Sequence, residues 1–290
     1  MKIAIVGAGG FLGTALMNKL ADNQIDEVYA FSFDFERQKA SFPKAENIIP
    51  VDNDEMDTFP FEMIDVVIHC AFPRNADSKV IAGGMHFAAK AIQMAARSKA
   101  IIHISSQSVY CSIRDLPAQE SDMPEPETKY AIGKYAMELL VNSVCGHIPH
   151  TNIRMASLIG PGFDQRVTNK MVAIALETGQ LHVKEDMQHF GYLDIKDAAD
   201  GILSLLQIPS EKWRHVYNLG SPQTYSLREI AETIADVVKE ETGKEITITF
   251  ETDTKLLNSA LDGSALSADT GFTPGISLRT SIHRILNSKQ

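Results

Sequence analysis

Long apolar runs are missing from this chain of 290 residues, and its first strand-like run, IAIV, has only four residues before a glycine. No stretch approaches the roughly 18 apolar residues of a transmembrane helix, and the first residues hold no apolar core long enough for a signal peptide. Cysteine is also scarce, because only Cys70, Cys111 and Cys145 occur and none lies in a CxxC pattern. These absences predict a soluble, cytoplasmic protein with free thiols and no membrane partner.

Basic charge is in deficit, with 27 Lys and Arg residues against 37 Asp and Glu residues and a net charge of −10. Such a chain has no cationic field to collect the phosphates of a nucleic acid, so we expect no nucleic-acid partner. The nine histidines form no HxH, HExxH or Cys/His cluster, which predicts no metal site. His69 and His103 lie inside apolar segments and are expected in the core.

Apolar segments of strand length alternate with amphipathic segments of helix length over the first part of the chain. This is the pattern of a parallel sheet whose two faces are covered by helices. The expected strands are KIAIVGA (2–8), EVYAFSF (27–33), NIIPV (47–51), DVVIHCA (65–71), AIIHISS (100–106) and HTNIRMASLI (150–159). We therefore predict an α/β fold with a Rossmann-type, doubly wound parallel sheet.

The rhythm of the sequence changes near residue 160. From there, helices at about 165–178, 196–207 and 226–241 are separated by loops and short strands such as EITITF at 245–250. We predict a larger domain over residues 1–160, to which residues 190–220 return. Residues 161–290 then form mainly a smaller α+β carboxyl-terminal lobe.

A glycine loop follows the first expected strand. Gly7, Gly10 and Gly13 are spaced GxxGxxG, with Phe11 and Leu12 between the last two, at the mouth of the first expected helix. Glycine lets the backbone turn tightly and lets a pyrophosphate approach the amides at the helix amino terminus. The loop therefore predicts a dinucleotide, NAD or NADP, in the larger domain.

The choice between NAD and NADP depends on the end of the second strand, where an acid would bind the adenine ribose hydroxyls. Counting along EVYAFSFDFER, that position falls on Ser32, with Asp34 two residues on. Asp34 could reach the ribose, or Ser32 and Arg37 could accept a 2′-phosphate. Asp52, after the third strand, could lie near the adenine or could be a loop or cap residue.

A tyrosine and a lysine, Tyr130 and Lys134, lie four residues apart in ETKYAIGKYAMELL, and Thr128 is the expected helix N-cap. A second pair with this spacing, Tyr192 and Lys196, straddles a strand-to-helix junction, so its side chains need not share a face. A nearby ammonium lowers the pKa of a phenol, which could then exchange a proton with a substrate oxygen. Tyr130 is therefore the candidate acid and base.

Two serines, Ser105 and Ser106, end the central strand of AIIHISSQSVY, at the edge where open parallel sheets bind ligands. A serine at a strand end is by itself often a cap or turn residue. We take these serines as candidate site residues because the glycine loop and the Tyr130 helix are expected at the same edge of the sheet.

The sequence resembles the extended short-chain dehydrogenase/reductase superfamily, in particular its NAD-dependent epimerase/dehydratase family. The resemblance lies in the order of a glycine loop, a strand that ends in serine and a helix with the Tyr-x-x-x-Lys spacing. The likeness continues through DVVIHCAF, NIRMASLIGPG, YLDIKDAADGI, VYNLGSPQTYSLREIAETI and ALDGSALSADTGFTPGISLRTSI. The resemblance implies an enzyme with Ser106, Tyr130 and Lys134 as its triad, Lys134 also holding the nicotinamide ribose, and Ala71 beside the cofactor. It implies hydride transfer between the nicotinamide and a carbinol or carbonyl carbon of a sugar-like small molecule.

Three departures from the family pattern narrow the substrate. Family dehydratases carry acids beside the serine position, but Gln107 and Ser108 follow it here, which disfavours dehydration. Ser157 and Phe190 stand where nucleotide-sugar enzymes often place an Asn and an Arg on the diphosphate. The residues that could substitute for that clamp are Arg166, Lys170 and His189.

Three functions therefore remain open. The first is an epimerase or reductase of a sugar-like substrate, with or without a linked nucleotide, and the second is a reductase of a non-sugar carbonyl. The third is a binding module that senses NAD(P), although such modules commonly lack the tyrosine or the lysine. A homodimer could form through GMHFAAKAIQMAARSK (84–99) and Ala136, Met137 and Leu140, which packing on the sheet would explain nearly as well.

Overall fold

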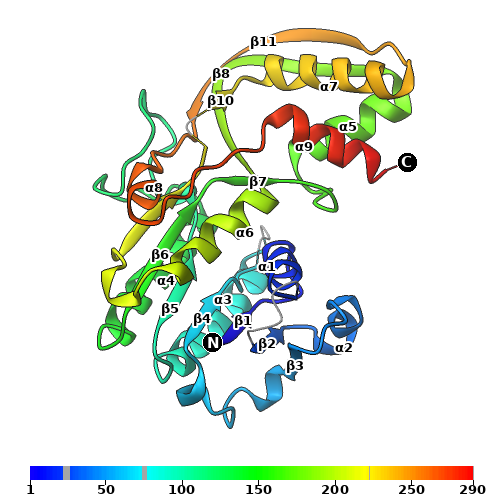
Figure 1. The fold of residues 1–290 in the computed structure, drawn as a ribbon. Helices are drawn as coiled ribbons and strands as arrows, with labels where there is room; N and C mark the ends of the chain where they lie inside the picture. The colour runs from blue at the N-terminus through cyan, green and yellow to red at the C-terminus, as the bar shows by residue number, and fades with distance from the viewer. Residues whose placement is uncertain (22–26, 74–76, 222, 290) are drawn as a thin grey trace.

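The computed structural model describes residues 1–21, 27–73, 77–221 and 223–289. Its larger sheet has seven strands, all parallel, in the order β3-β2-β1-β4-β5-β6-β9. These strands are β1 (Lys2–Val6), β2 (Glu27–Ser32), β3 (Ile48–Asp52), β4 (Val66–His69), β5 (Ile101–Ile104), β6 (His150–Met155) and β9 (Val216–Leu219). The strand order reverses between β1 and β4, which is where parallel sheets of this kind bind ligands (Figure 1).

Helices cover both faces of this sheet, because its strands are apolar on both sides. On one face, Ile3 and Ile5 of β1 pack with α1 (Phe11–Ala21) and α6 (Ile195–Ser204). On the other, Ala4 and Val6 pack with α3 (Ser78–Ala95) and α4 (Lys129–Val144). The predicted doubly wound parallel α/β sheet is confirmed.

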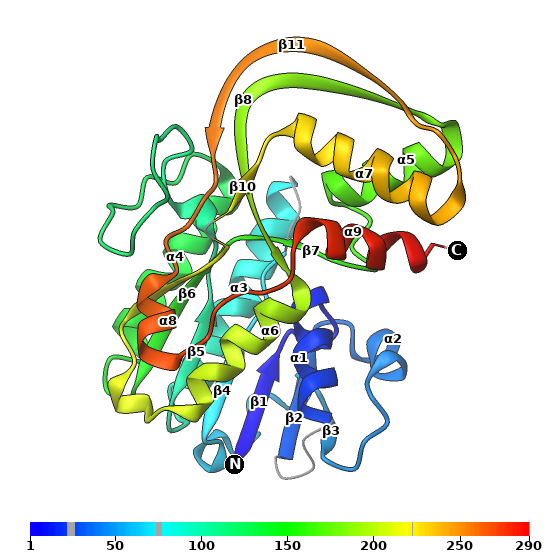
Figure 2. The same ribbon diagram turned by 45° about the horizontal axis from the view of Figure 1, so that its top comes forward.

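The smaller lobe lies above the carboxyl ends of the strands (Figure 2). Its long strand β8 pairs in parallel with β7 and β11 and antiparallel with β10, and its helices α5, α7 and α9 bury a separate apolar core. Its elements are β7 (Ser157–Ile159), α5 (Val167–Thr178), β8 (Gln180–Asp194), β10 (Thr224–Tyr225), α7 (Leu227–Thr242), β11 (Thr247–Asn258) and α9 (Leu278–Asn287). Two further short helices are α2 (Phe35–Gln38), after β2, and α8 (Ser264–Thr270), which packs near β9.

One expected strand, 150–159, is two strands in the structure. β6 belongs to the larger sheet, but the chain leaves that sheet at Ala156 and β7 pairs with β8 instead. The chain returns to the larger sheet through α6, which packs on α1, and β9, which pairs with β6. Ser157 therefore stands where the two sheets meet.

The residues of α4 that the sequence suggested for a dimer contact pack inside the larger domain instead. Met137 is buried there, and Ala136 and Leu140 are partly buried against the same cluster. Exposed apolar residues on α4 include Ile132 and Leu139.

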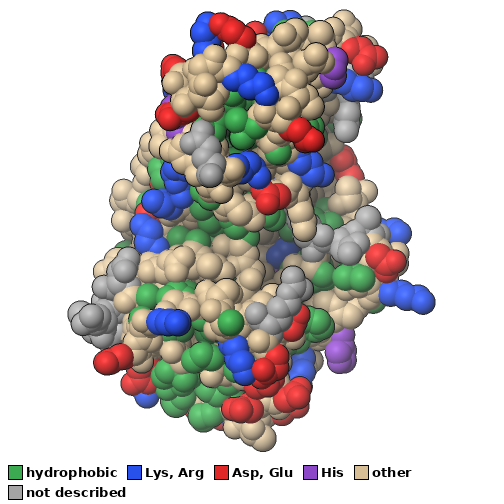
Figure 3. All heavy atoms as spheres, turned by 90° about the vertical axis from the view of Figure 1, so that its right-hand side faces the viewer, with side chains coloured by type: hydrophobic (Ala, Val, Ile, Leu, Met, Phe, Trp, Pro, Cys, Tyr) green, Lys and Arg blue, Asp and Glu red, His purple; other side chains and the backbone are tan. Residues whose placement is uncertain are grey.

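The surface carries mixed charge. On the face drawn in Figure 3, Lys and Arg side chains lie among Asp and Glu side chains, and the surface is hollowed between the lobe and the larger domain. None of the helices within the described residues is both long and apolar enough to cross a membrane.

Candidate active site

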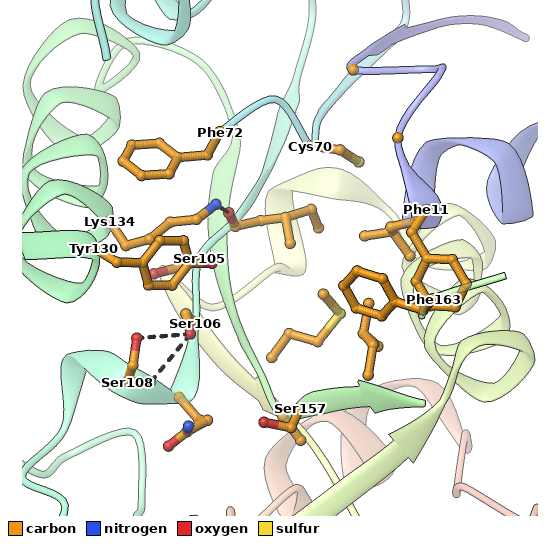
Figure 4. Close-up of a pocket in the computed structure, with 18 of the residues that line it drawn as sticks. Phe11, Cys70, Phe72, Ser105, Ser106, Ser108, Tyr130, Lys134, Ser157 and Phe163 are labelled. Atoms are coloured by element: carbon orange, nitrogen blue, oxygen red, sulfur yellow. Dashed lines mark hydrogen bonds between the residues drawn. The ribbon is translucent and has the colours of Figure 1, made fainter. Parts of the chain in front are cut away.

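A cavity of about 870 Å³ opens at the carboxyl ends of β1, β4, β5 and β6. The segments that form its wall include the glycine loop, the chain after β4, the end of β5, the start of α4 and the chain that follows β6. Its lining includes Gly7, Gly10, Phe11, Leu12, Gly13, Cys70, Phe72, Ser105, Ser106, Gln107, Ser108, Tyr130, Lys134, Ser157, Phe163 and Arg166. The structure thus brings the predicted glycine loop and the predicted Ser, Tyr and Lys residues to one cavity (Figure 4).

The glycine loop needs its glycines for steric reasons. Gly7 has a φ of 92°, and a Cβ on it would lie 2.8 Å from the backbone nitrogen of Ala71. A Cβ on Gly13 would lie 2.7 Å from Ala8 Cα. Bare backbone is therefore exposed where α1 begins, and its amide groups suit a pyrophosphate.

Ser32, Asp34 and Asp52, predicted for the adenosine end, are not among the residues that line this cavity. Ser32 is fully buried, and Asp34 is exposed before α2. The Asp52 carboxylate accepts a hydrogen bond from the backbone N–H of Asp54 (3.1 Å), as a cap of the helical turn Asn53–Glu55. Arg37 lies in α2, and its side chain is outside the described part of the structure. The role of each in cofactor choice stays a prediction.

Gln38 is a neighbour of the glycine loop that the sequence did not indicate. Its side-chain amide lies directly over Gly9, in the space where a Cβ would be. No pattern in the sequence connects α2 to that loop, because the contact depends on how the chain turns after β2.

Lys134 is buried, with 4% of its surface exposed. Its ammonium donates a hydrogen bond to the carbonyl oxygen of Ile104 (2.7 Å) and lies 4.8 Å from the centre of the Phe72 ring. Burial lowers the pKa of Lys134 to about 8, and the nearby Cys70 and Glu138 oppose that shift. The ammonium therefore sits close to its titration point at physiological pH.

Tyr130 projects from the first turn of α4, which begins after Thr128. The Thr128 hydroxyl accepts a hydrogen bond from the backbone N–H of Ala131 (3.1 Å) and so fixes where the helix starts. The Tyr130 ring lies edge-on to Phe72, with ring centres 5.6 Å apart. Figure 4 shows Tyr130 and Lys134 side by side on one wall of the cavity, opposite Phe11 and Phe163.

The Ser106 hydroxyl is oriented by Ser108. Its oxygen accepts hydrogen bonds from the Ser108 backbone N–H (3.2 Å) and the Ser108 hydroxyl (2.9 Å), as drawn in Figure 4. A hydroxyl has one donor and two acceptor positions, and these two bonds use both acceptors. Ser106 is therefore set up to donate to a ligand oxygen rather than to accept a proton.

An aromatic stack forms the opposite wall, and it joins Phe11, which the sequence places in the glycine loop, to Phe163, which no sequence pattern indicated. The rings of Phe11 and Phe163 lie 4.3 Å apart, and the Arg166 guanidinium lies 5.0 Å from the Phe163 ring centre. Phe163 follows an irregular loop, so no periodic pattern placed it in the cavity. The stack joins the glycine loop to the start of α5 in the smaller lobe.

The three residues that could replace a diphosphate clamp differ in whether they reach the cavity. Arg166 lines the cavity, as does Ser157, but Lys170 and His189 do not. Phe190 lies in β8 and stacks on Tyr192, with ring centres 6.0 Å apart. Arg166 is thus the member of that set in the cavity wall.

The two core histidines form a pair. His69 Nδ1 and His103 Nδ1 are 2.9 Å apart and both rings are fully buried. Burial lowers the pKa of both imidazoles, that of His69 to about 3, so both are neutral. Burial also raises the pKa of the Cys70 thiol to about 12, which makes it a poor nucleophile. Nowhere in the described residues do three or more His, Cys, Asp or Glu side chains gather as a metal site would need.

A doubly wound parallel sheet with a glycine loop between its first strand and first helix defines a dinucleotide-binding fold. The profile of the NAD dependent epimerase/dehydratase family matches residues 3–220, and the chain belongs to this family. The resemblance seen in the sequence is confirmed. The family is described as one of NAD-dependent epimerases and dehydratases.

Two curated relatives have different activities. The chain is 28% identical to GDP-6-deoxy-D-mannose reductase of Pseudomonas aeruginosa over 212 residues, which span 66% of each chain. It is 24% identical to dTDP-D-glucose 4,6-dehydratase of Homo sapiens, over 63% of this chain and 55% of that one. The matched region thus leaves about a third of the first relative and nearly half of the second uncovered.

Solved structures share the whole fold. UDP-glucuronic acid 4-epimerase from Bacillus cereus, in complex with UDP-glucuronic acid and NAD, superimposes with a TM-score of 0.83 at 20% identity over 99% of this chain and 98% of that one. UDP-glucose 4-epimerase from Thermotoga maritima, with UDP-glucose, gives 0.82 at 18% identity over 100% and 98%. At these identities the similarity defines the fold.

Proposed function

We propose that this protein is an NAD(P)-dependent epimerase or reductase that transfers hydride at a carbinol or carbonyl carbon of a sugar-like, nucleotide-linked substrate. The observation that supports this most is the single cavity shared by the glycine loop and by Ser106, Tyr130 and Lys134. In this proposal residues 1–160 and 190–220 bind the cofactor, and the remainder of 161–290 binds the substrate.

The bare backbone of the glycine loop at the start of α1 fits a pyrophosphate, and a bound nicotinamide dinucleotide would carry the hydride. Tyr130 gives a proton to the substrate oxygen, or takes one from it, as that carbon is reduced or oxidised. Lys134 stabilises the phenolate by its positive charge and binds the nicotinamide ribose. Ser106 donates a hydrogen bond to the same substrate oxygen.

The charge and polarity of the wall support a sugar nucleotide. Neutral hydrogen-bonding side chains near Tyr130 include Ser106, Gln107, Ser108 and Ser157, which suit a polyhydroxylated body. The charged side chains in the described lining are Lys129, Lys134 and Arg166, all cationic, in a chain with a net charge of −10. Cations without carboxylates favour an anionic ligand. The relatives with known substrates act on nucleotide-linked sugars.

Dehydration is disfavoured in this proposal. Gln107 and Ser108 occupy the positions at which an acid and base pair would be needed to eliminate water, and neither side chain is ionisable at neutral pH. The Ser108 hydroxyl is also committed to Ser106.

A second candidate is an NAD(P)H-dependent reductase of a non-sugar carbonyl. It is favoured by the apolar wall of Phe11, Phe163, Met155 and Leu158, and by Phe190 in place of a cation. A carbonyl compound with an apolar body would fit that wall without a diphosphate clamp.

Substrate panels separate the two candidates. Equilibrium mixtures should form from UDP-glucuronic acid or UDP-glucose without net NADH if the protein is an epimerase. Steady NADH or NADPH consumption with a 4-keto sugar nucleotide indicates a reductase of the first kind. Consumption with simple ketones alone, and none with any sugar nucleotide, would reject the sugar proposal in favour of the second candidate.

A further inference from the structure

Glu138 of α4 and Arg154 of β6 form an ion pair in the interior. Arg154 Nη2 lies 2.9 Å from Glu138 Oε2, and the side chains are only 5% and 2% exposed. Arg154 Nε lies 3.2 Å from both carboxylate oxygens. Desolvation makes such a pair a weak source of stability, and an apolar pair of similar volume would often serve as well. Its position suggests a different role.

The pair lies directly behind the proposed catalytic residues. Glu138 follows Lys134 by one helical turn, and its carboxylate accepts a hydrogen bond from the Ser105 hydroxyl. Lys134 bonds the carbonyl of Ile104, the residue before Ser105. Helix α4 is thus tied through two side chains to the two residues that precede Ser106.

Arg154 extends the connection across the sheet. Its Nη1 donates to the Tyr110 hydroxyl (3.0 Å), and the Tyr110 hydroxyl donates to Asn218 Oδ1 (2.8 Å). Asn218 lies in β9 and is fully buried. One run of hydrogen bonds therefore holds α4, the end of β5, the turn before Tyr110 and β9 in a fixed relation.

The charge of Glu138 matters because of what else surrounds Lys134. Among the described residues, the ionisable groups around Lys134 include Cys70 from the chain after β4 and the neutral imidazoles His69 and His103 from β4 and β5. Tyr130 and Glu138, from α4 itself, also face it. Arg154 faces Glu138 from β6, on the side of the carboxylate. Cys70 also favours the Lys134 ammonium, but burial keeps its thiol protonated at neutral pH, so Glu138 supplies the formal negative charge.

We propose that Glu138, held by Arg154, is a positioning residue: it fixes Ser105 beside Ser106 and keeps the Lys134 ammonium charged next to Tyr130. The consequence for catalysis rests on the proposed function, but the effect on Lys134 does not. It can be measured with no substrate at all.

The test is an NMR titration of the protein labelled with ¹³C at the lysine Cε, with the Lys134 signal assigned from Lys134→Met. In Glu138→Gln, the proton affinity of Lys134 should fall by at least about tenfold, roughly one pKa unit. Glu232→Gln is the matched control, because Glu232 pairs with Arg228 one turn away on the exposed face of α7. It should leave the Lys134 signal unchanged.

A double variant separates positioning from folding. Glu138→Gln alone leaves the Arg154 charge buried and unpaired, which destabilises the fold. Glu138→Gln with Arg154→Met removes both charges, so its unfolding midpoint should recover toward that of the wild type while the lowered Lys134 titration persists. A Lys134 titration equal to that of the wild type in both variants overturns the proposal.

Activity measurements distinguish a failure of the proposed function from a failure of the positioning proposal. If Tyr130→Phe and Lys134→Met catalyse as well as the wild type, the catalytic reading is wrong, although Glu138 can still be seen to control Lys134. If those variants are inactive but Glu138→Gln keeps both the wild-type kcat and the wild-type Lys134 titration, only the positioning proposal fails.

Discussion

At the scale of single residues, the burial of Lys134 gives the reaction a pH limit. Its pKa of about 8 means that the ammonium is present below that pH and lost above it. Since the charge supports the Tyr130 phenolate, kcat should decline as pH rises through about 8. A pH profile of hydride transfer checks this, and a profile that stays flat to pH 10 would show that the lysine charge is not used.

Tyr130→Phe removes the proton donor and leaves the ring and its contact with Phe72. We expect kcat to fall by about 10²–10⁴-fold, the usual contribution of a general acid or base. Dinucleotide affinity, measured by quenching of protein fluorescence, should change little. Tyr192→Phe is the control with the same spacing to a lysine, and it should keep its activity because Tyr192 lies in β8 and outside the cavity lining.

The place of a residue in the site was predictable from the sequence where it depends on spacing within one helix. Tyr130 and Lys134 share a helix, and both line the cavity as that spacing suggests. The role of Ser108 in orienting Ser106 was not predictable, because the partner of a hydroxyl group depends on tertiary packing. The place of Phe163 in the cavity wall was not predictable either, because it depends on the path of a loop. The sequence left two roles for Asp52, a contact with the ligand or a helix cap. In the structure its side chain caps a helical turn.

At the scale of elements, the glycine loop and α1 depend on two very close backbone approaches. Gly13→Ala would place a Cβ 2.7 Å from Ala8 Cα and force the helix away from the strand. We expect dinucleotide affinity to fall at least about tenfold, equivalent to about 1.4 kcal/mol. Calorimetric titration with NAD measures it.

Gly83→Ala is the matched control, because nothing lies within 4 Å of a Cβ at Gly83, in the middle of α3. It should bind NAD as the wild type does and gain up to about 1 kcal/mol in unfolding free energy, since alanine favours helix more than glycine does. Equal loss of affinity in both variants would mean that the loop geometry is not what binding requires.

Elements with strong local patterns were predictable, and the exceptions have physical causes. Strands β1 to β6 of the larger sheet begin within a residue of where the sequence places them, but β9 was not among the expected strands. β11 continues to Asn258, well beyond EITITF, because β8 pairs with it on both sides of a register shift between Thr252 and Leu256. The break at Ala156 was hidden, since HTNIRMASLI runs through it without a glycine or a proline, and β6 and β7 differ in the strands that they pair with.

At the scale of the whole molecule, Asp194 joins the larger domain to the carboxyl-terminal helix. Its buried carboxylate caps α6 at the N–H of Lys196 (2.8 Å), and accepts from the Ser281 hydroxyl (2.6 Å) and Arg284 Nη1 (2.6 Å) of α9. Asp194→Ala should cost about 3 kcal/mol or more of unfolding free energy, measured by denaturant titration.

Asp164→Ala is the comparison variant, because the Asp164 side chain is 70% exposed where it meets Lys289. An exposed ion pair contributes little, so the loss should stay below about 1 kcal/mol. Similar losses in the two variants would show that Asp194 does not hold the lobe to the domain.

The central claim is that one cavity holds a nicotinamide dinucleotide against Ser106, Tyr130 and Lys134. It is tested most directly by mass spectrometry of the small molecules released when the purified protein is denatured, before and after incubation with NAD and NADP. We predict one equivalent of dinucleotide per chain, with NAD already bound on purification if the cofactor is recycled within an epimerase cycle, and acquired only on incubation if the enzyme is an exchanging reductase. A protein that releases neither nucleotide, even after incubation with both, would contradict the account.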